Sequence, residues 1–169
     1  MFKIILTFTL ILAGCSTIPN PKSEEARLIA ASKQATYVDT QEKSPASITR
    51  VETTGTSGNY IFAVTVDSPD TGCDRYADWW EVVTPEGELI YRRVLLHSHV
   101  DEQPFERTGG AVAIKPEQEV IVRVHMSPNG YSNQARKGTV ASGFAAVTLA
   151  DDFAQDLAVV EPLPQNCAF

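Results

Sequence analysis

Three histidines and one carboxylate are the residues in this sequence best suited to metal chemistry. His97 and His99 alternate in the segment HSHVDE, Glu102 follows three positions later, and His125 lies in a separate apolar stretch. Neutral imidazoles with a carboxylate as fourth ligand form a set that suits Zn²⁺ or Cu²⁺. A site built from these four residues requires that the two stretches become neighbouring strands.

Strand parity decides whether these side chains share a surface, because side chains alternate between the two faces of a strand. Around His125, alternation leaves Arg123 and His125 opposite the valines and methionine of the core face. In 88–99 we expect the face that carries Arg92 to be the core side, which turns Arg93 and both other histidines outward. One sheet would then present all three imidazoles. The alternative is that the first two histidines are solvated polar residues at the end of a strand.

Two adjacent tryptophans, Trp79 and Trp80, follow the same rule, so one indole points inward and the other outward. The inward ring is expected in the core, where it buries a large apolar area. The outward ring serves either as a platform for a ligand or as a side chain packed beneath a loop. With Arg93 and Arg123, the tryptophans make up a candidate surface patch.

The segment from Tyr91 to Gly110 resembles the first metal-binding motif of cupins, in which an H-x-H pair precedes a glutamate and a later glycine. Only two residues separate His99 from Glu102 here, fewer than in the cupin motif, and Tyr91 stands where that motif has glycine. The second cupin motif, P-x-G-x2-H, is approached at PNGYS, but Asn133 replaces its histidine. The resemblance implies a metal-binding jelly roll, and these departures argue against one.

Motifs of catalytic sites do not occur in the sequence. It contains no G-x-S-x-G nucleophile elbow, no H-E-x-x-H zinc motif and no glycine loop that would hold a phosphate. We therefore assign no catalytic residue, and an enzyme is the less favoured class.

The chain opens with Lys3 and an apolar run from Ile4 to Ala13. This run is shorter than the 20 or so residues that span a bilayer, and it has the length of a secretory signal peptide. Its end, Leu12-Ala13-Gly14-Cys15, resembles the lipobox of bacterial lipoprotein precursors.

That resemblance implies that residues 1–14 are removed and that Cys15 carries a diacylglycerol and a further acyl chain such as palmitate. Several acyl chains hold a protein firmly on a membrane. Ser16 stands where aspartate would retain the protein at the inner membrane. The implied location is the outer membrane, with the folded part facing the periplasm.

The remaining two cysteines, Cys73 and Cys167, form an even pair in an exported protein, so we predict a disulfide between them. It would tie the C-terminal tail to the loop around Cys73. The competing interpretation, Cys73 as a nucleophile, requires a thiolate that an oxidising compartment would consume.

The sequence predicts a tether over 15–46, partly disordered or with a short helix, and one folded domain over 47–169. Period-two patterns and turn residues separate the expected strands, with polar loops at 101–110 and 127–138 and a short helical turn capped by Asp151. The expected strands are 47–54, 59–68, 76–85, 88–99, 111–114, 118–126 and 139–150. Strands at this spacing favour an all-β, antiparallel β-sandwich of the immunoglobulin or fibronectin-III type, with a jelly roll as the alternative.

Composition narrows the partners of this domain. The formal net charge of −7 argues against nucleic acid and against electrostatic attachment to anionic lipid. The expected contacts are the membrane, through the lipid anchor, and a protein of the cell envelope, with no cofactor. The sequence therefore favours a non-catalytic binding or scaffold module, and the alternative is a Zn or Cu protein that uses the three histidines.

Overall fold

The computed structural model describes residues 44–168. The predicted signal peptide, Cys15 and nearly all of the predicted tether lie outside the described residues. Nine strands and one short 3-10 helix make up the domain: β1 (Ser47–Thr56), β2 (Asn59–Asp67), β3 (Tyr76–Val83), β4 (Leu89–Val94), β5 (Phe105–Val112), β6 (Val120–Ser127), β7 (Gly130–Tyr131), β8 (Gln134–Thr139), β9 (Gly143–Thr148) and η1 (Gln155–Val159).

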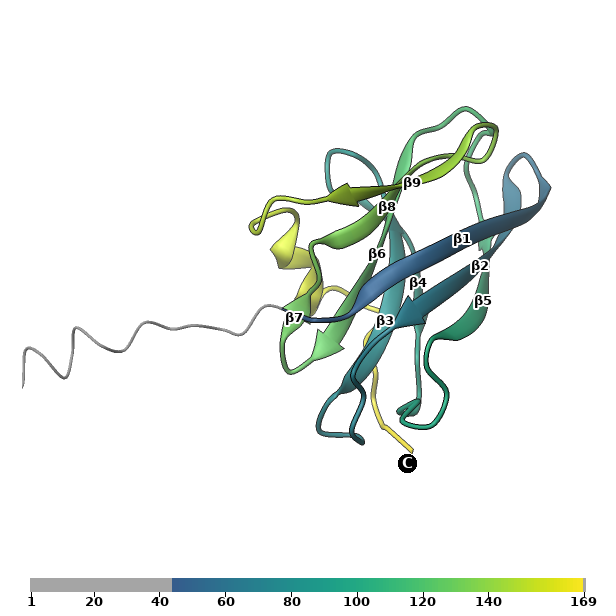
Figure 1. Cartoon of the computed structure of the whole chain (residues 1–169). Coiled ribbons are helices and arrows are strands. Elements are labelled where there is room, and N and C mark those ends of the chain that lie inside the picture. The colour runs from purple at the N-terminus through teal and green to yellow at the C-terminus, as the bar shows by residue number, and fades with distance from the viewer. Residues whose placement is uncertain (1–43, 169) are drawn as a thin grey trace, which may run out of the picture. The chain divides into compact units, whose positions relative to one another are not determined.

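These strands form two antiparallel sheets that pack face to face (Figure 1). One sheet has the order β1-β2-β5, and the other has the order β4-β3-β6-β8-β9, with β7 paired to β6. The chain crosses between sheets from β2 to β3, from β4 to β5 and from β5 to β6. The predicted β-sandwich is therefore confirmed, in a fibronectin-III-type strand order with β9 added at one edge.

The main hydrophobic core lies between the two sheets. Alternation on β2 sends Phe62, Val64 and Val66 inward, and they meet Trp80 of β3 and the valines of β6. Each such side chain contributes about 1.5–3 kcal/mol when fully buried. The period-two pattern that identified these strands thus also selects the residues of this core.

A second hydrophobic cluster covers the outer face of the six-stranded sheet. Every residue of β3 is buried, because a C-terminal cover (residues 149–163) packs over the face that points away from β1 and β2. Leu157 of η1 is the buried residue of that short helix, and in Figure 1 the yellow C-terminal segment lies beside β7. A sandwich strand normally buries one face, so burial of both makes β3 the centre of the domain.

Gly87 in the turn from β3 to β4 shows how closely the C-terminal cover approaches. Its φ is +91°, and a Cβ at this position would lie 2.8 Å from the Cβ of Ala154. The amide of Gly87 donates to the carbonyl of Thr84 at 3.0 Å, which closes the turn from Thr84 to Gly87.

Both segments predicted as polar loops contain strands. β5 lies largely within 101–110, and most of β8 lies within 127–138. The prediction was wrong because antiparallel strands with one face in solvent carry polar residues at alternate positions.

Strand ends also differ from the prediction. β4 ends at Val94, and beyond it His97 forms only an isolated bridge with Ala168. The predicted strand 139–150 divides into the end of β8 and β9, because Gly143 has a φ of +81° and turns the chain. The N-cap of η1 is Ala154, with no side-chain cap, so Asp151 does not cap it.

The predicted disulfide joins Cys73 and Cys167, whose Cα atoms are 5.6 Å apart. It fixes the end of the tail beside the extension of β4, where the amide of Ala168 donates to the carbonyl of Leu96 at 2.8 Å. Within residues 44–168, no helix is long and apolar enough to cross a membrane. Because these residues contain both sheets, both hydrophobic clusters and the disulfide, they have what a domain needs to fold by itself.

Candidate functional site

A buried ion cluster lies at the centre of the outer face of the six-stranded sheet. Glu81 of β3 stands directly opposite Arg92 of β4 on one side and Arg123 of β6 on the other. Arg92 Nε donates to Glu81 Oε2 at 2.8 Å, and Arg123 Nε donates to Glu81 Oε1 at 2.8 Å. Each carboxylate oxygen therefore serves one arginine, and all three side chains are almost fully shielded from solvent.

The two guanidinium groups also bind the backbone of the C-terminal cover. Arg123 donates to the carbonyls of Phe153 at 2.7 Å and Ala154 at 2.8 Å. Arg92 donates to the carbonyl of Leu157 at 2.7 Å and to those of Val160 and Pro162. These charge-assisted hydrogen bonds join the cover to the sheet through backbone carbonyls of the cover.

Aromatic rings enclose this cluster. The Arg123 guanidinium carbon lies 3.5 Å from the centroid of Tyr131, and that of Arg92 lies 4.6 Å from the centroid of Trp79. Arg92 also donates to the Tyr131 hydroxyl at 3.1 Å. Burial, followed by the Glu81 carboxylate, raises the pKa of Tyr131 to about 12, so this phenol stays protonated at physiological pH.

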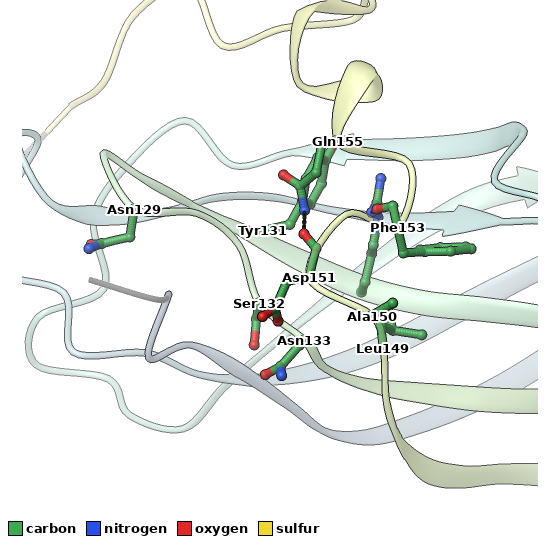
Figure 2. A pocket seen from close by; sticks show the side chains of 10 residues that line it. Asn129, Tyr131, Ser132, Asn133, Leu149, Ala150, Asp151, Phe153 and Gln155 are labelled. Atoms are coloured by element: carbon green, nitrogen blue, oxygen red, sulfur yellow. Dashed lines mark hydrogen bonds between the residues drawn. The ribbon is translucent and has the colours of Figure 1, made fainter. Parts of the chain in front are cut away.

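A polar pocket of about 220 Å³ opens between the cover and the strands next to it (Figure 2). Figure 2 shows that one wall comes from the segment that runs from Asn129 to Asn133 and the other from residues 149–155. The Gln155 side-chain amide donates to the carbonyl of Asp151 at 2.9 Å, which steadies the second wall. The lining residues are Arg123, Asn129, Tyr131, Ser132, Asn133, Leu149, Ala150, Asp151, Phe153 and Gln155.

The chemistry of this pocket suits a neutral, polar ligand. Its amides and hydroxyls both donate and accept hydrogen bonds. Among the described residues, Arg123 is the one cation in its lining. Arg123 shares the Glu81 carboxylate with Arg92, and the carboxylate of Asp151 lies in the same lining, so these four groups together carry no net charge. The pocket therefore offers hydrogen bonds without an uncompensated charge.

His125, the third predicted metal ligand, belongs to a different environment. Its Nδ1 lies 2.6 Å from Asp78 Oδ1, and its ring stacks on Trp79 with centroids 3.7 Å apart. Tyr131 contacts the same imidazole edge-on at 4.9 Å. His125 thus takes part in the second hydrophobic cluster.

His97 and His99 lie together, as predicted, with ring centroids 4.6 Å apart. His99 is 4% exposed and stacks on Phe105 at 3.7 Å, and neither of its ring nitrogens has a hydrogen-bond partner in the described part of the chain. Burial, with a smaller effect from Arg107, lowers the pKa of His99 to about 4, so its imidazole is neutral at physiological pH.

Glu102, the predicted fourth ligand, is engaged by Arg107. The guanidinium donates to both carboxylate oxygens, at 3.2 and 2.7 Å, and this ion pair lowers the pKa of Glu102. Across residues 44–168, no group of three His, Cys, Asp or Glu side chains is placed to hold one metal ion. The structure brings together His97 and His99 but does not add His125 to them.

The expected orientation of β4 was wrong. Tyr91 and Leu95 face the main core, whereas Arg92 lies beneath the C-terminal cover. The predicted surface patch is corrected in the same way: Trp79, Trp80 and Arg123 are 3%, 0% and 1% exposed, and only Arg93 reaches solvent. Trp79, the outward tryptophan, packs beneath the C-terminal cover, in line with the predicted alternative of a side chain covered by a loop.

Sequence reasoning missed Glu81 and Tyr131, on which this region depends. Glu81 had a detectable signal, because a charged residue inside the apolar run WWEVV requires a buried partner if both faces of the strand are covered. Asp70 was also missed: it accepts the amides of Ala77 and His99 and the Ser68 hydroxyl, and so holds the loops on either side together.

A mostly apolar groove of about 590 Å³ lies between the end of β4 and the tail. Leu96, which is 58% exposed, forms one wall, and residues 161–168 form the other. The tail is held there by the disulfide and by the backbone pairing of Ala168.

Comparison with known proteins gives one relative and no family. The chain is 33% identical over 127 residues to a protein of Halomicrobium mukohataei named "Putative lipoprotein". The match covers 72% of this chain and 63% of that relative, so it leaves more than a third of the relative unmatched. No protein-family model and no solved structure matches the chain.

Proposed function

We propose that this protein is a lipoprotein whose β-sandwich is a non-catalytic binding module of the cell envelope. The polar pocket in Figure 2 supports the binding part of this proposal, because amide and hydroxyl groups line it and its charged groups balance one another. The ligand class that fits is a small neutral molecule rich in hydroxyl or amide groups.

Two observations support the anchor. The segment Leu12-Ala13-Gly14-Cys15 resembles a lipobox, and a relative is named as a lipoprotein. Ser16 favours the outer membrane and a domain that faces the periplasm. The role of a scaffold for another envelope protein belongs to the same proposal, with the lipid keeping the domain at the membrane.

The anchor is tested by labelling the full chain with radioactive palmitate in a bacterial host and separating the membranes. We expect label in the outer membrane, its loss in Cys15→Ala, and transfer to the inner membrane in Ser16→Asp. Cys73→Ala is the matched control, because it removes a different cysteine. Label in Cys15→Ala would contradict the anchor.

The pocket is tested by NMR titration of ¹⁵N-labelled residues 44–169. N-acetylglucosamine and N-acetylalanine amide serve as neutral probes, and acetate and lysine as charged ones. We expect a neutral probe to shift amides of 129–133 and 149–155, and Asn133→Ala to weaken this binding while Gln165→Ala, an exposed amide outside the pocket, leaves it unchanged. Shifts from the charged probes alone, or none at all, would refute the ligand class.

A further inference from the structure

A second cavity, separate from the polar pocket, lies at the end of β4. It measures about 130 Å³ and is lined by Arg93, His97, His99 and Arg107 together with the chain at 94–96. We propose that this histidine corner, meaning these four residues, binds a small oxyanion, namely a carboxylate or phosphate group.

The histidine corner contains hydrogen-bonding groups of His99 and Arg93 that have no partner within residues 44–168. His99 is buried, and its ring nitrogens have no partner within residues 44–168. The side chain of Arg93 has no hydrogen bond or ion pair to any residue of that same described range, so its guanidinium offers a full set of N–H donors. A buried polar group without a partner costs free energy, and a ligand that accepts its N–H removes that cost.

The charge of the residues that line the cavity favours an anion over a metal ion. Among residues 44–168, no carboxylate lines this cavity, whereas two guanidinium groups do. Glu102 is held by Arg107 through two hydrogen bonds, and the Asp70 carboxylate, 3.8 Å from His99 Nδ1, already accepts three. A divalent cation would therefore be repelled by Arg93, whose positive charge has no paired carboxylate within residues 44–168, whereas an oxyanion would be attracted by it.

Size and protonation agree with a small oxyanion. A cavity near 150 Å³ accepts a ligand of about six non-hydrogen atoms, which covers phosphate and acetate. The neutral His99 imidazole keeps one N–H to donate. An anion beside it stabilises the imidazolium form, so binding raises the pKa of His99 from its value of about 4.

The test follows the ring signals of the three histidines by NMR in residues 44–169, at constant ionic strength. Inorganic phosphate, acetate and Zn²⁺ are added separately. We expect saturable shifts of His97 and His99 with phosphate, acetate or both, with a dissociation constant on the order of 1 mM, and a rise in the pKa of His99. His125, which lies with Asp78 and Trp79, is the internal control and stays unchanged.

Arg93→Gln is the decisive variant, and Arg50→Gln, an exposed arginine of β1, is its matched control. Loss of one charge-assisted contact weakens anion binding roughly tenfold in Arg93→Gln, with no change in Arg50→Gln. A response to phosphate alone or to acetate alone identifies the group that the site prefers. Equal loss in both variants, shifts of all three histidines together, or saturation by Zn²⁺ without a response to either anion would overturn the proposal. None of these results depends on the polar pocket.

Discussion

Replacing Glu81 with glutamine tests whether the ion cluster holds the C-terminal cover to the sheet. Glutamine keeps the shape of the side chain but removes the negative charge that both arginines share. Arg92 and Arg123 would then be two buried cations whose remaining partners are uncharged. Breaking a buried ion pair by removing one partner costs about 3–5 kcal/mol.

The contacts of Glu81 indicate that its loss costs at least about 3 kcal/mol of the free energy of unfolding. Glu81 serves two arginines rather than one, and both oxygens make hydrogen bonds of 2.8 Å. The carbonyls of the cover continue to accept from the guanidinium groups, which offsets part of the cost. We therefore expect the free energy of unfolding to fall by about 3–5 kcal/mol.

Urea unfolding followed by tryptophan fluorescence measures this change, and hydrogen exchange of 149–163 locates it. The matched control is Glu119→Gln, the same substitution in the exposed pair with Lys137, which we expect to cost about 0–1 kcal/mol. Exchange in the cover should rise more than exchange in β2. A loss below about 1 kcal/mol in Glu81→Gln, or equal losses in the two variants, would refute the role assigned to the cluster.

Three further predictions concern the disulfide, the turn before β4 and the acid response of His99. Cys73→Ser combined with Cys167→Ser should lower the free energy of unfolding by about 2–5 kcal/mol, measured in urea, whereas reductant should leave this double variant unaffected. Gly87→Ala should cost about 1–2 kcal/mol, because its φ is +91° and its Cβ would strike Ala154; an unchanged melting temperature would count against that close approach. The pKa of His99, near 4, is below the unfolded value of about 6.5, so its protonation favours the unfolded chain, and stability should fall by up to about 3 kcal/mol as the pH drops from 6.5 to 4. His99→Phe keeps the stacking on Phe105 and should remove the part of the acid response that belongs to His99, while the other ionisable groups around the ring, Asp70, Glu102, His97 and Arg107, stay in place. The same acid slope in both proteins would contradict the assignment.

The fold was predictable where apolar and polar residues alternate clearly along a strand. Phe62, Val64 and Val66 alternate with more exposed neighbours, and this pattern alone located β2 and its inner face. β5 and β8 were missed because their strands face solvent on one side and carry polar residues there. The polarity of a residue indicates whether it is buried or exposed, but it does not indicate whether an exposed segment is a strand or a loop.

The candidate sites were less predictable, because they depend on contacts far along the chain. Strand parity placed Arg123 and His125 on one face of β6, but it did not show that the C-terminal cover would pack over that face. The face of β4 that carries Arg92 was assigned to the main core for the same reason. Arg92 donates to the carbonyl of Leu157, 65 positions away, and no local sequence pattern reveals such a contact.

The sequence by itself predicted the core strands β2, β3 and β6 and the pairing of Cys73 with Cys167, because alternation and the number of cysteines can both be read from the chain without its fold. It also places His97 and His99 side by side, because residues two apart in an extended segment point the same way. Only the tertiary structure decided that His125 lies elsewhere, that Trp79 is buried and that Glu81 joins two arginines. The two arginines also donate to backbone carbonyls of the C-terminal cover. Since every residue has a carbonyl, no sequence motif marks these acceptors in advance.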